Sequence, residues 1–175
     1  LMVLPPLNWN GPLNFEVYAT SIEPTDFDLD ADHIKLSFFS FVVNVEAIAD
    51  APILMAPAFF TGDQDSVIGL TGLGAFLVDT ITTNGAEVLS TLISGVPPDT
   101  IFSSGFNNGE SGTGDGTYSW SIPADDIGSL TMTPPTGFGG TVTLTLTGIT
   151  FEPNGSEANS TVSFDVVLTP IADTF

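Results

Sequence analysis

The sequence has almost no positive charge. Lys35 is the only lysine or arginine among 175 residues, and it stands against 21 aspartates and glutamates, which gives a formal net charge of −20. Nucleic acids and anionic membrane surfaces would be repelled by this chain, with nothing basic to offset the repulsion. The composition therefore excludes both as partners and favours divalent cations. A surface this acidic also suits a salty medium, in which charges are screened over short distances.

Cysteine is absent, and long apolar runs are absent too. The chain can form no disulfide and offers no thiol chemistry. Its longest apolar stretches, around 38–43 and 51–60, fall well short of the roughly 18 residues that a membrane helix needs, so we expect no direct membrane insertion. No secretion signal is visible, and we expect any such signal to lie outside this sequence.

Histidine is nearly absent, which limits the catalytic chemistry. A serine nucleophile needs a base, and the one imidazole, His33, stands in an acidic segment with no Gly-x-Ser-x-Gly motif elsewhere in the chain. The pair Gly72 and Gly74 lacks the further glycine and the lysine of a phosphate loop. Carboxylate pairs for glycoside hydrolysis are defined by their distance in space, and the sequence singles out no such pair. We therefore predict that the protein is not an enzyme, and the sequence identifies no small-molecule substrate.

Short segments of alternating apolar and polar residues dominate what is present. This period of two is typical of strands with one buried face, and glycine, proline and asparagine turns separate the segments. The strands predicted after residue 47 are 53–55, 67–71, 87–94, 100–103, 117–122, 130–133, 141–151 and 161–169. Only 123–129 reads as a helical turn. The pattern predicts an all-β fold, an antiparallel Greek-key β-sandwich.

Two details of the predicted strand 141–151 are specific. The apolar positions switch from even to odd numbers at Gly148, which predicts a β-bulge there. Four alternate threonines should face outward, and we interpret them as strand-forming residues rather than a binding comb. They are Thr141, Thr143, Thr145 and Thr147.

The chain repeats part of its own sequence. Residues 1–24 align with 130–153 without a gap, and 41–50 align with 164–173, with identities that include Pro5 with Pro134 and Gly11 with Gly140. A period of roughly 120 to 130 residues is the size of a domain rather than of a solenoid repeat. We therefore predict a rod of tandem sandwiches. Residues 1–47 are expected to be the C-terminal half of a preceding repeat, and 48–175 one complete repeat.

Several motifs together resemble a known family. They include Ile48-Ala-Asp-Ala-Pro52, Gly62-Asp-Gln-Asp-Ser66, Asp79-Thr80, Asn84-Gly-Ala-Glu-Val-Leu-Ser90, Ile93-Ser-Gly-Val-Pro97, Gly114-Asp-Gly-Thr-Tyr-Ser-Trp120 and Leu130-Thr-Met-Thr-Pro-Pro135. The chain resembles the cadherin-like, Ig-like tandem repeats of giant bacterial RTX adhesins. The resemblance implies a calcium-stiffened extender that carries a ligand-binding region away from the cell, in an extracellular or cell-surface protein of adhesion and biofilm formation.

Acidic residues gather around the segment that joins the two predicted parts. Calcium prefers six to eight oxygen ligands, and carboxylates crowded at a domain junction supply them while losing their mutual repulsion. The residues expected to converge at this junction are Glu23, Asp50, Asp63, Asp65 and Asp79. Glu152 and Asp173 are expected to serve the next junction.

A second candidate calcium site lies in the acidic segment 25–33. Its carboxylates are spaced alternately, at Asp26, Asp28, Asp30 and Asp32. An EF-hand loop has such alternation, but it also has a central glycine and a final glutamate, which this segment lacks. The sequence fits both interpretations of this segment, a local calcium site and a solvated loop.

The leading hypothesis from the sequence is a calcium-dependent extender of a large surface adhesin, whose partners are adjacent repeats of the same chain. The alternative is a subunit of an extracellular filament or sheath, in which neighbouring chains complete one another's sandwiches. Residues 1–47 supply too few strands for a domain. Their apolar face is therefore expected to need a partner. It consists of Phe15, Val17, Phe39, Phe41, Val43 and Val45.

Overall fold

The protein is described by a computed structural model, which defines residues 2–22, 34–78, 87–110 and 114–172. The chain divides into two compact units, unit 1 (Leu1–Ala47) and unit 2 (Ile48–Phe175). Strands account for most of the described residues, with one short 3₁₀-helix, η2 (Ala124–Ser129). The prediction of a mainly β chain is confirmed. None of the described helices is long and apolar enough to span a bilayer.

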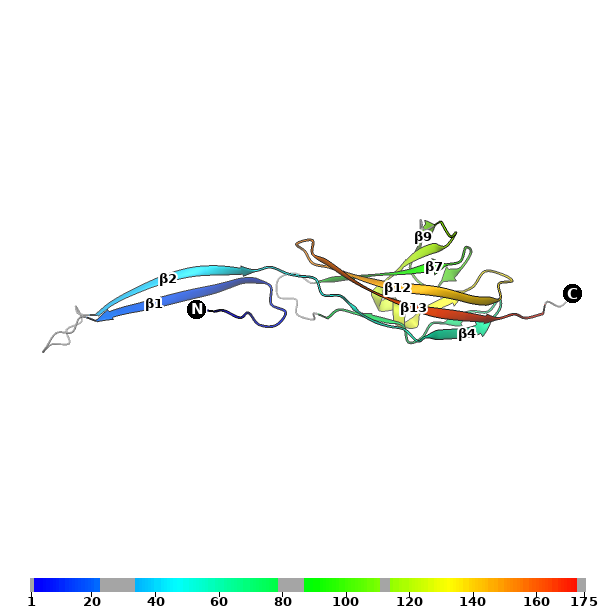
Figure 1. The fold of residues 1–175 in the computed structure, drawn as a ribbon, viewed down its shortest axis with the longest axis horizontal. Coiled ribbons are helices and arrows are strands. Elements are labelled where there is room, and N and C mark those ends of the chain that lie inside the picture. Colours follow the sequence, from blue (N-terminus) through cyan, green and yellow to red (C-terminus); the bar gives the residue numbers. More distant parts are fainter. Residues whose placement is uncertain (1, 23–33, 79–86, 111–113, 173–175) are drawn as a thin grey trace. The chain divides into compact units, whose positions relative to one another are not determined.

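Unit 1 is built on one long antiparallel hairpin, β1 (Gly11–Ile22) with β2 (Ile34–Val45), which Figure 1 shows in blue and cyan. Its register runs without interruption from Gly11 opposite Val45 to Ile22 opposite Ile34. Cross-strand aromatic pairs support it, because the rings of Phe15 and Phe41 stack with centroids 5.2 Å apart. Among the described residues these two strands form a sheet of their own.

Unit 2 contains a six-stranded sheet in the order β4-β13-β12-β7-β10-β9, a three-stranded sheet in the order β5-β11-β8, and the pair β3-β6. The six strands of the first sheet are β4 (Phe59–Asp63), β13 (Glu157–Thr169), β12 (Gly140–Phe151), β7 (Val88–Val96), β10 (Tyr118–Ile122) and β9 (Phe106–Glu110). The others are β5 (Ile68–Gly69), β11 (Thr131–Thr133), β8 (Ile101–Phe102), β3 (Ile53–Met55) and β6 (Gly74–Phe76).

The hairpin β12–β13 forms the centre of the large sheet. Figure 1 shows it with β7 beside β12 and β4 beside β13. β12 pairs antiparallel with β7 from Thr145 to Phe151, whereas β13 pairs parallel with β4 from Asp165 to Thr169. The hairpin is therefore covered on both edges by strands that come from residues 59–96.

One hydrophobic core joins the large sheet to the three-stranded sheet. Phe164, Leu144 and Trp120 from the large sheet are buried in the same cluster as Met132 and Phe102 from the small one. The rings of Phe102 and Trp120 meet edge to face, 5.4 Å apart. Burying each such side chain contributes about 1.5 to 3 kcal/mol, so this cluster is the main source of stability in unit 2.

The two long hairpins of the chain have the same geometry. Gly11 pairs with Val45 as Gly140 pairs with Leu168, and these are the correspondences given by the sequence alignment. A matching turn precedes each hairpin: Trp9 N donates to Pro6 O over 3.2 Å, and Phe138 N donates to Pro135 O over 3.1 Å. Both turns contain a residue with positive φ, at Asn8 (59°) and Gly137 (74°).

The predicted bulge at Gly148 is wrong. The register passes through Gly148 opposite Ser160 without a shift, and the buried positions of β12 stay even-numbered through Thr150. Glycine is needed there for space, because a Cβ at Gly148 would lie 2.9 Å from Leu54 Cδ2 and from Pro52 Cγ. The alternate threonines of β12 lie on the outward face, as predicted.

Three short strands were not predicted: β4, β6 and β9. None of their sequences alternates clearly, since β4 contains Phe59 and Phe60 in succession and β6 begins with a glycine. Each is short and is defined by pairing with a neighbouring strand. Tertiary pairing decides their conformation, and local pattern does not reveal it.

Candidate functional site

The linker 48–52 is anchored to one end of unit 2 by three hydrogen bonds. Ala49 N donates to Ser156 Oγ over 3.0 Å, and Asp50 N donates to Glu87 Oε1 over 3.1 Å. Thr150 Oγ1 donates to Asp50 O over 2.6 Å. All three bonds use main-chain atoms of the linker, so the Asp50 side chain itself is left exposed at this end. We call the group formed by Ala49, Asp50, Glu87, Thr150, Glu152 and Ser156 the linker pole.

Two glutamates are buried at the linker pole. Phe151 is paired with Val88, so Glu152 and Glu87 follow on adjacent strands just beyond that pair. Glu152 is 7% exposed and Glu87 is 8% exposed. Like charges at neighbouring positions of adjacent strands destabilise a sheet, and buried carboxylates that lack compensation lose their solvation. The end of the sheet thus concentrates negative charge where the linker joins it.

The Glu87 carboxylate is only partly compensated by hydrogen bonds. Its Oε1 atom accepts the bond from Asp50 N, while its buried Oε2 atom has no hydrogen-bond partner in the described part of the chain. A buried polar atom left without a partner costs about 1 to 3 kcal/mol, and a charged one costs more. A cation beside Oε2 would remove this cost. Glu87 was not among the residues predicted from the sequence to bind calcium. Its position has the same parity as that of the buried Ile93, and this shared parity is the sequence signal that its side chain points inward.

The described residues alone do not complete a metal site. Within 2–22, 34–78, 87–110 and 114–172, no three aspartate, glutamate or histidine side chains form a group that could hold a metal ion. At most two of Glu87, Glu152 and Asp50 therefore contribute to one cation, and the other oxygen ligands would have to come from other residues. Seven predicted ligands lie outside the described residues: Glu23, Asp26, Asp28, Asp30, Asp32, Asp79 and Asp173.

The predicted grouping of the acids is wrong in two respects. Asp63 is opposite Thr169, at the end of β13 that lies away from the linker pole, and Asp65 follows it. A hairpin of 12 residue pairs is roughly 40 Å long, so these two carboxylates cannot share a cation with Asp50 in one unit. Glu152, which was assigned to the next junction, lies instead at the linker pole. Asp63 lies at the far end because β4, which was not predicted, runs parallel to β13.

Asp65 has a structural role at the opposite end of unit 2. Its Oδ1 atom accepts a 2.7 Å bond from Gly137 N, in the turn that precedes β12. Asp65 itself has a φ of 60°, a left-handed conformation that aspartate adopts more readily than most residues. Next to it, Gln64 Oε1 accepts a 3.2 Å bond from Ile171 N. The loop 64–66 therefore fixes the two segments that enter and leave the central hairpin.

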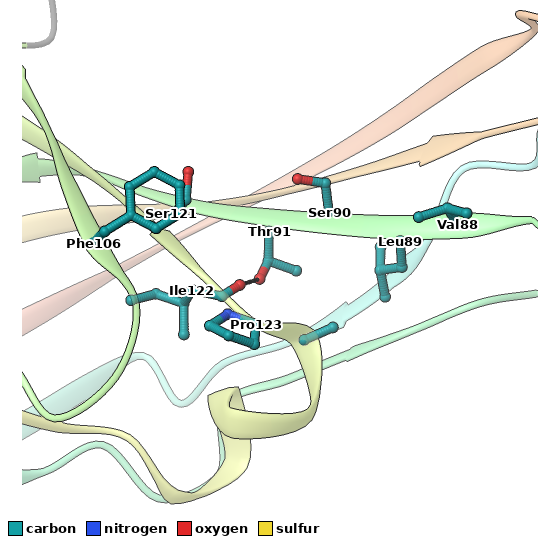
Figure 2. Close-up of a pocket in the computed structure, with 9 residues that line it drawn as sticks. Val88, Leu89, Ser90, Thr91, Phe106, Ser121, Ile122 and Pro123 are labelled. Atoms are coloured by element: carbon teal, nitrogen blue, oxygen red, sulfur yellow. Dashed lines mark hydrogen bonds between the residues drawn. The ribbon is translucent and has the colours of Figure 1, made fainter.

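A hollow of about 370 Å³ lies between β7 and β10, where β10 ends (Figure 2). Pairing between the strands stops at Ile122 opposite Thr91, and Pro123 then directs the chain into η2. The Thr91 hydroxyl donates to the Ile122 carbonyl, the bond dashed in Figure 2. The lining has no titratable side chain and consists of Val88, Leu89, Ser90, Thr91, Phe106, Ser121, Ile122, Pro123 and Ala124. This hollow offers apolar surface and hydroxyls but no acid or base.

In comparisons with known proteins, no protein-family model and no curated protein sequence matches the chain.

Proposed function

We propose that this chain is a calcium-stiffened extender segment of a large secreted or cell-surface adhesin, and not an enzyme. In this proposal it consists of tandem Greek-key β-sandwiches that hold a ligand-binding region away from the cell. The observation that carries the proposal is the correspondence of the two hairpins, which agree in register, in the preceding turn and in the glycine that begins each first strand. A repeated structural unit of domain size is what an extender of this kind is made of.

The packing of unit 2 supports the sandwich. The six-stranded sheet and the three-stranded sheet bury their apolar faces in one shared cluster, and two sheets packed over a common core are the basis of the sandwich architecture. The pairing of β12 with β7 and of β13 with β4 also brings together strands that are far apart in the chain, as Greek-key connections do.

The linker pole supports calcium as the stiffening ion. Glu87 and Glu152 are buried at the end of the sheet, and Asp50, an exposed residue of the linker, is held to Glu87 by its main-chain N–H. Calcium, when bound, would supply positive charge and many coordination positions to these oxygens. In the proposal Asp50 and Glu87, together with acids from beyond the linker pole, hold the linker in one orientation and so remove its freedom as a hinge.

Calcium titration of the 175-residue chain tests this function. Sites of extracellular modules bind calcium at about 10⁻⁴ to 10⁻³ M, so calorimetry should show saturable binding in that range and the melting temperature should rise with it. Sodium chloride at matched ionic strength is the control, because screening alone also stabilises so acidic a protein. Identical melting curves in calcium, in chelator and in the sodium control would contradict the calcium part of the proposal.

The exposed strand edges of unit 1 also favour the filament alternative. β1 and β2 each pair only with the other in the described structure, and such edges can accept a strand from a neighbouring molecule. Sedimentation velocity distinguishes the two functions. A filament subunit should form polymers that grow with protein concentration, whereas an extender segment should not.

A further inference from the structure

The hairpin of unit 1 has an apolar face whose counterpart in unit 2 is completely covered. The buried face of β12–β13 consists of Val142, Leu144, Leu146, Phe164, Val166 and Leu168, none of them more than 7% exposed. Their counterparts on β1–β2 are Leu13, Phe15, Val17, Phe41, Val43 and Val45, and none of these is buried. Val17, for example, is 48% exposed and Val43 is 38% exposed. The same register thus carries a covered apolar face in one unit and an uncovered one in the other.

The strand edges differ between the units in the same way. In unit 2, β7 lies against β12 from Thr145 to Phe151, and the corresponding positions of β1 are 16–22. β4 lies parallel to β13 from Asp165 to Thr169, and the corresponding positions in unit 1 are 42–46, at the end of β2. In unit 1, no described strand occupies either edge. The main-chain groups there are available for strand addition.

We propose that the β1–β2 hairpin is the acceptor of a specific strand addition, whose occupant is a segment like residues 48–129 of this chain. The occupant places a β7-like strand antiparallel to β1 and a β4-like strand parallel to β2, and its inward side chains cover the face of Phe15 and Phe41. This inference rests on the tandem-repeat part of the proposed function and adds the register and the identity of the partner.

The occupant belongs to the same polypeptide as the hairpin rather than to a second copy of this chain. The 48–129 segment of every copy is already packed on its own β12–β13 hairpin, and strands β4 and β7 are both used there. A second copy could lend these strands only by opening its core, which would expose Phe164 and the rest of the cluster. A preceding repeat in a tandem array carries the same kind of segment with no competing hairpin.

The test places a second copy of residues 48–129 directly before the 175-residue chain. Hydrogen exchange of β1 and β2 should then slow by about 100-fold or more, because their amides become part of a closed sheet. Phe41→Ser in unit 1 should abolish this protection, since Phe41 corresponds to the buried Phe164. Phe38→Ser is the matched control, because Phe38 lies on the opposite face and corresponds to the exposed Thr161. It should leave the protection unchanged.

Cysteine pairs test the register, because the chain has no cysteine of its own. Thr147 pairs with Leu92, and the counterpart of Thr147 is Tyr18. Tyr18→Cys in unit 1 should therefore form a disulfide with Leu92→Cys in the added copy. The same Tyr18→Cys should not react with Val88→Cys, which would lie about 13 Å out of register, beyond the reach of a disulfide.

Three results would overturn the proposal. One is unchanged exchange of β1 and β2 in the extended chain while unit 2 stays folded. Another is disulfide formation without preference for the predicted pair. The third is concentration-dependent protection of the hairpin in the unextended chain, which would identify a second copy as the occupant. If the extended chain is insoluble, a peptide of residues 88–96 carrying Leu92→Cys replaces it, and the absence of an in-register cross-link then also counts against the proposal. All readouts are taken in chelator, so they do not depend on the calcium titration.

Discussion

Replacement of Glu87 by glutamine should have opposite effects on stability in chelator and in calcium. The Glu87 carboxylate is 8% exposed, accepts one main-chain bond at Oε1 and has an uncompensated Oε2 atom. Glutamine keeps the acceptor for Asp50 N and removes the buried charge. In chelator the variant should therefore be as stable as the parent chain or more stable, by up to about 1 to 3 kcal/mol.

Calcium should reverse the order. For a site with a dissociation constant of about 10⁻⁴ to 10⁻³ M, 10 mM calcium stabilises the parent by about 1.4 to 2.7 kcal/mol. That corresponds to a rise of roughly 4 to 12 °C in melting temperature for a domain of this size. Glu87→Gln should lose most of this increment, because it removes a ligand charge.

Thermal unfolding followed by circular dichroism, with denaturant titration in parallel, measures both effects. Asp99→Asn is the matched control: it makes the same change in charge at an exposed residue with a φ of 65°, a conformation that asparagine tolerates. An equal calcium increment in Glu87→Gln and in the parent would refute the assignment of Glu87 to a cation site. Marked destabilisation of Glu87→Gln in chelator would refute the view that its buried charge is uncompensated.

Three further predictions concern packing, hydrogen bonding and titration. Gly148→Ala should destabilise unit 2 by about 1 to 3 kcal/mol in denaturant titration, because the added Cβ would be 2.9 Å from Leu54 and Pro52 atoms, whereas Gly69→Ala, with open space around it, should have little effect. Thr150→Val should cost about 1 to 3 kcal/mol in the same assay, because the partly buried Asp50 carbonyl loses the 2.6 Å bond from the Thr150 hydroxyl. An unchanged stability would show that this bond does not anchor the linker. The Glu16 carboxylate accepts a 2.5 Å bond from the Tyr18 hydroxyl and raises the pKa of Tyr18 above 10.0, because the bond exists only while Tyr18 is protonated. Glu16→Gln should therefore shift phenolate formation to lower pH in an ultraviolet titration. An unchanged titration would exclude the bond.

The sequence was sufficient to predict the long strands, and the inward face of β12 as far as Gly148, because β12 and β13 alternate over many residues and their counterparts β1 and β2 share the alignment. It was not sufficient for β4, whose strand conformation depends on parallel pairing with β13. That omission also explains the wrong grouping of Asp63 with Asp50. Without the direction of β4, the sequence could not show at which end of the sheet Asp63 lies.

Gly148 and Glu87 show a second limit of sequence reasoning. Gly148 was interpreted as a bulge from the change in apolar parity, but it is a place where the linker residue Pro52 packs closely against the sheet. Glu87 was passed over because an acid in a strongly acidic chain is usually solvated, and only the packing shows that it is buried. In both cases the contacting residue belongs to the linker, which is far away in the sequence: Pro52 packs against Gly148, and Asp50 donates its main-chain N–H to Glu87.

The central claim, that calcium stiffens the joint between consecutive units, is tested most directly with two complete repeats in tandem. Residues 48–170 followed by residues 48–175 place a second Ile48–Pro52 linker at the joint. Small-angle scattering should show a larger maximum dimension and a narrower distribution of conformations in calcium than in chelator. Asp50→Ala in the second copy should abolish most of this change while leaving the main-chain bonds of Asp50 intact, and the same substitution in the first copy, which has no preceding repeat, should not. Identical dimensions in calcium and in chelator would contradict the account.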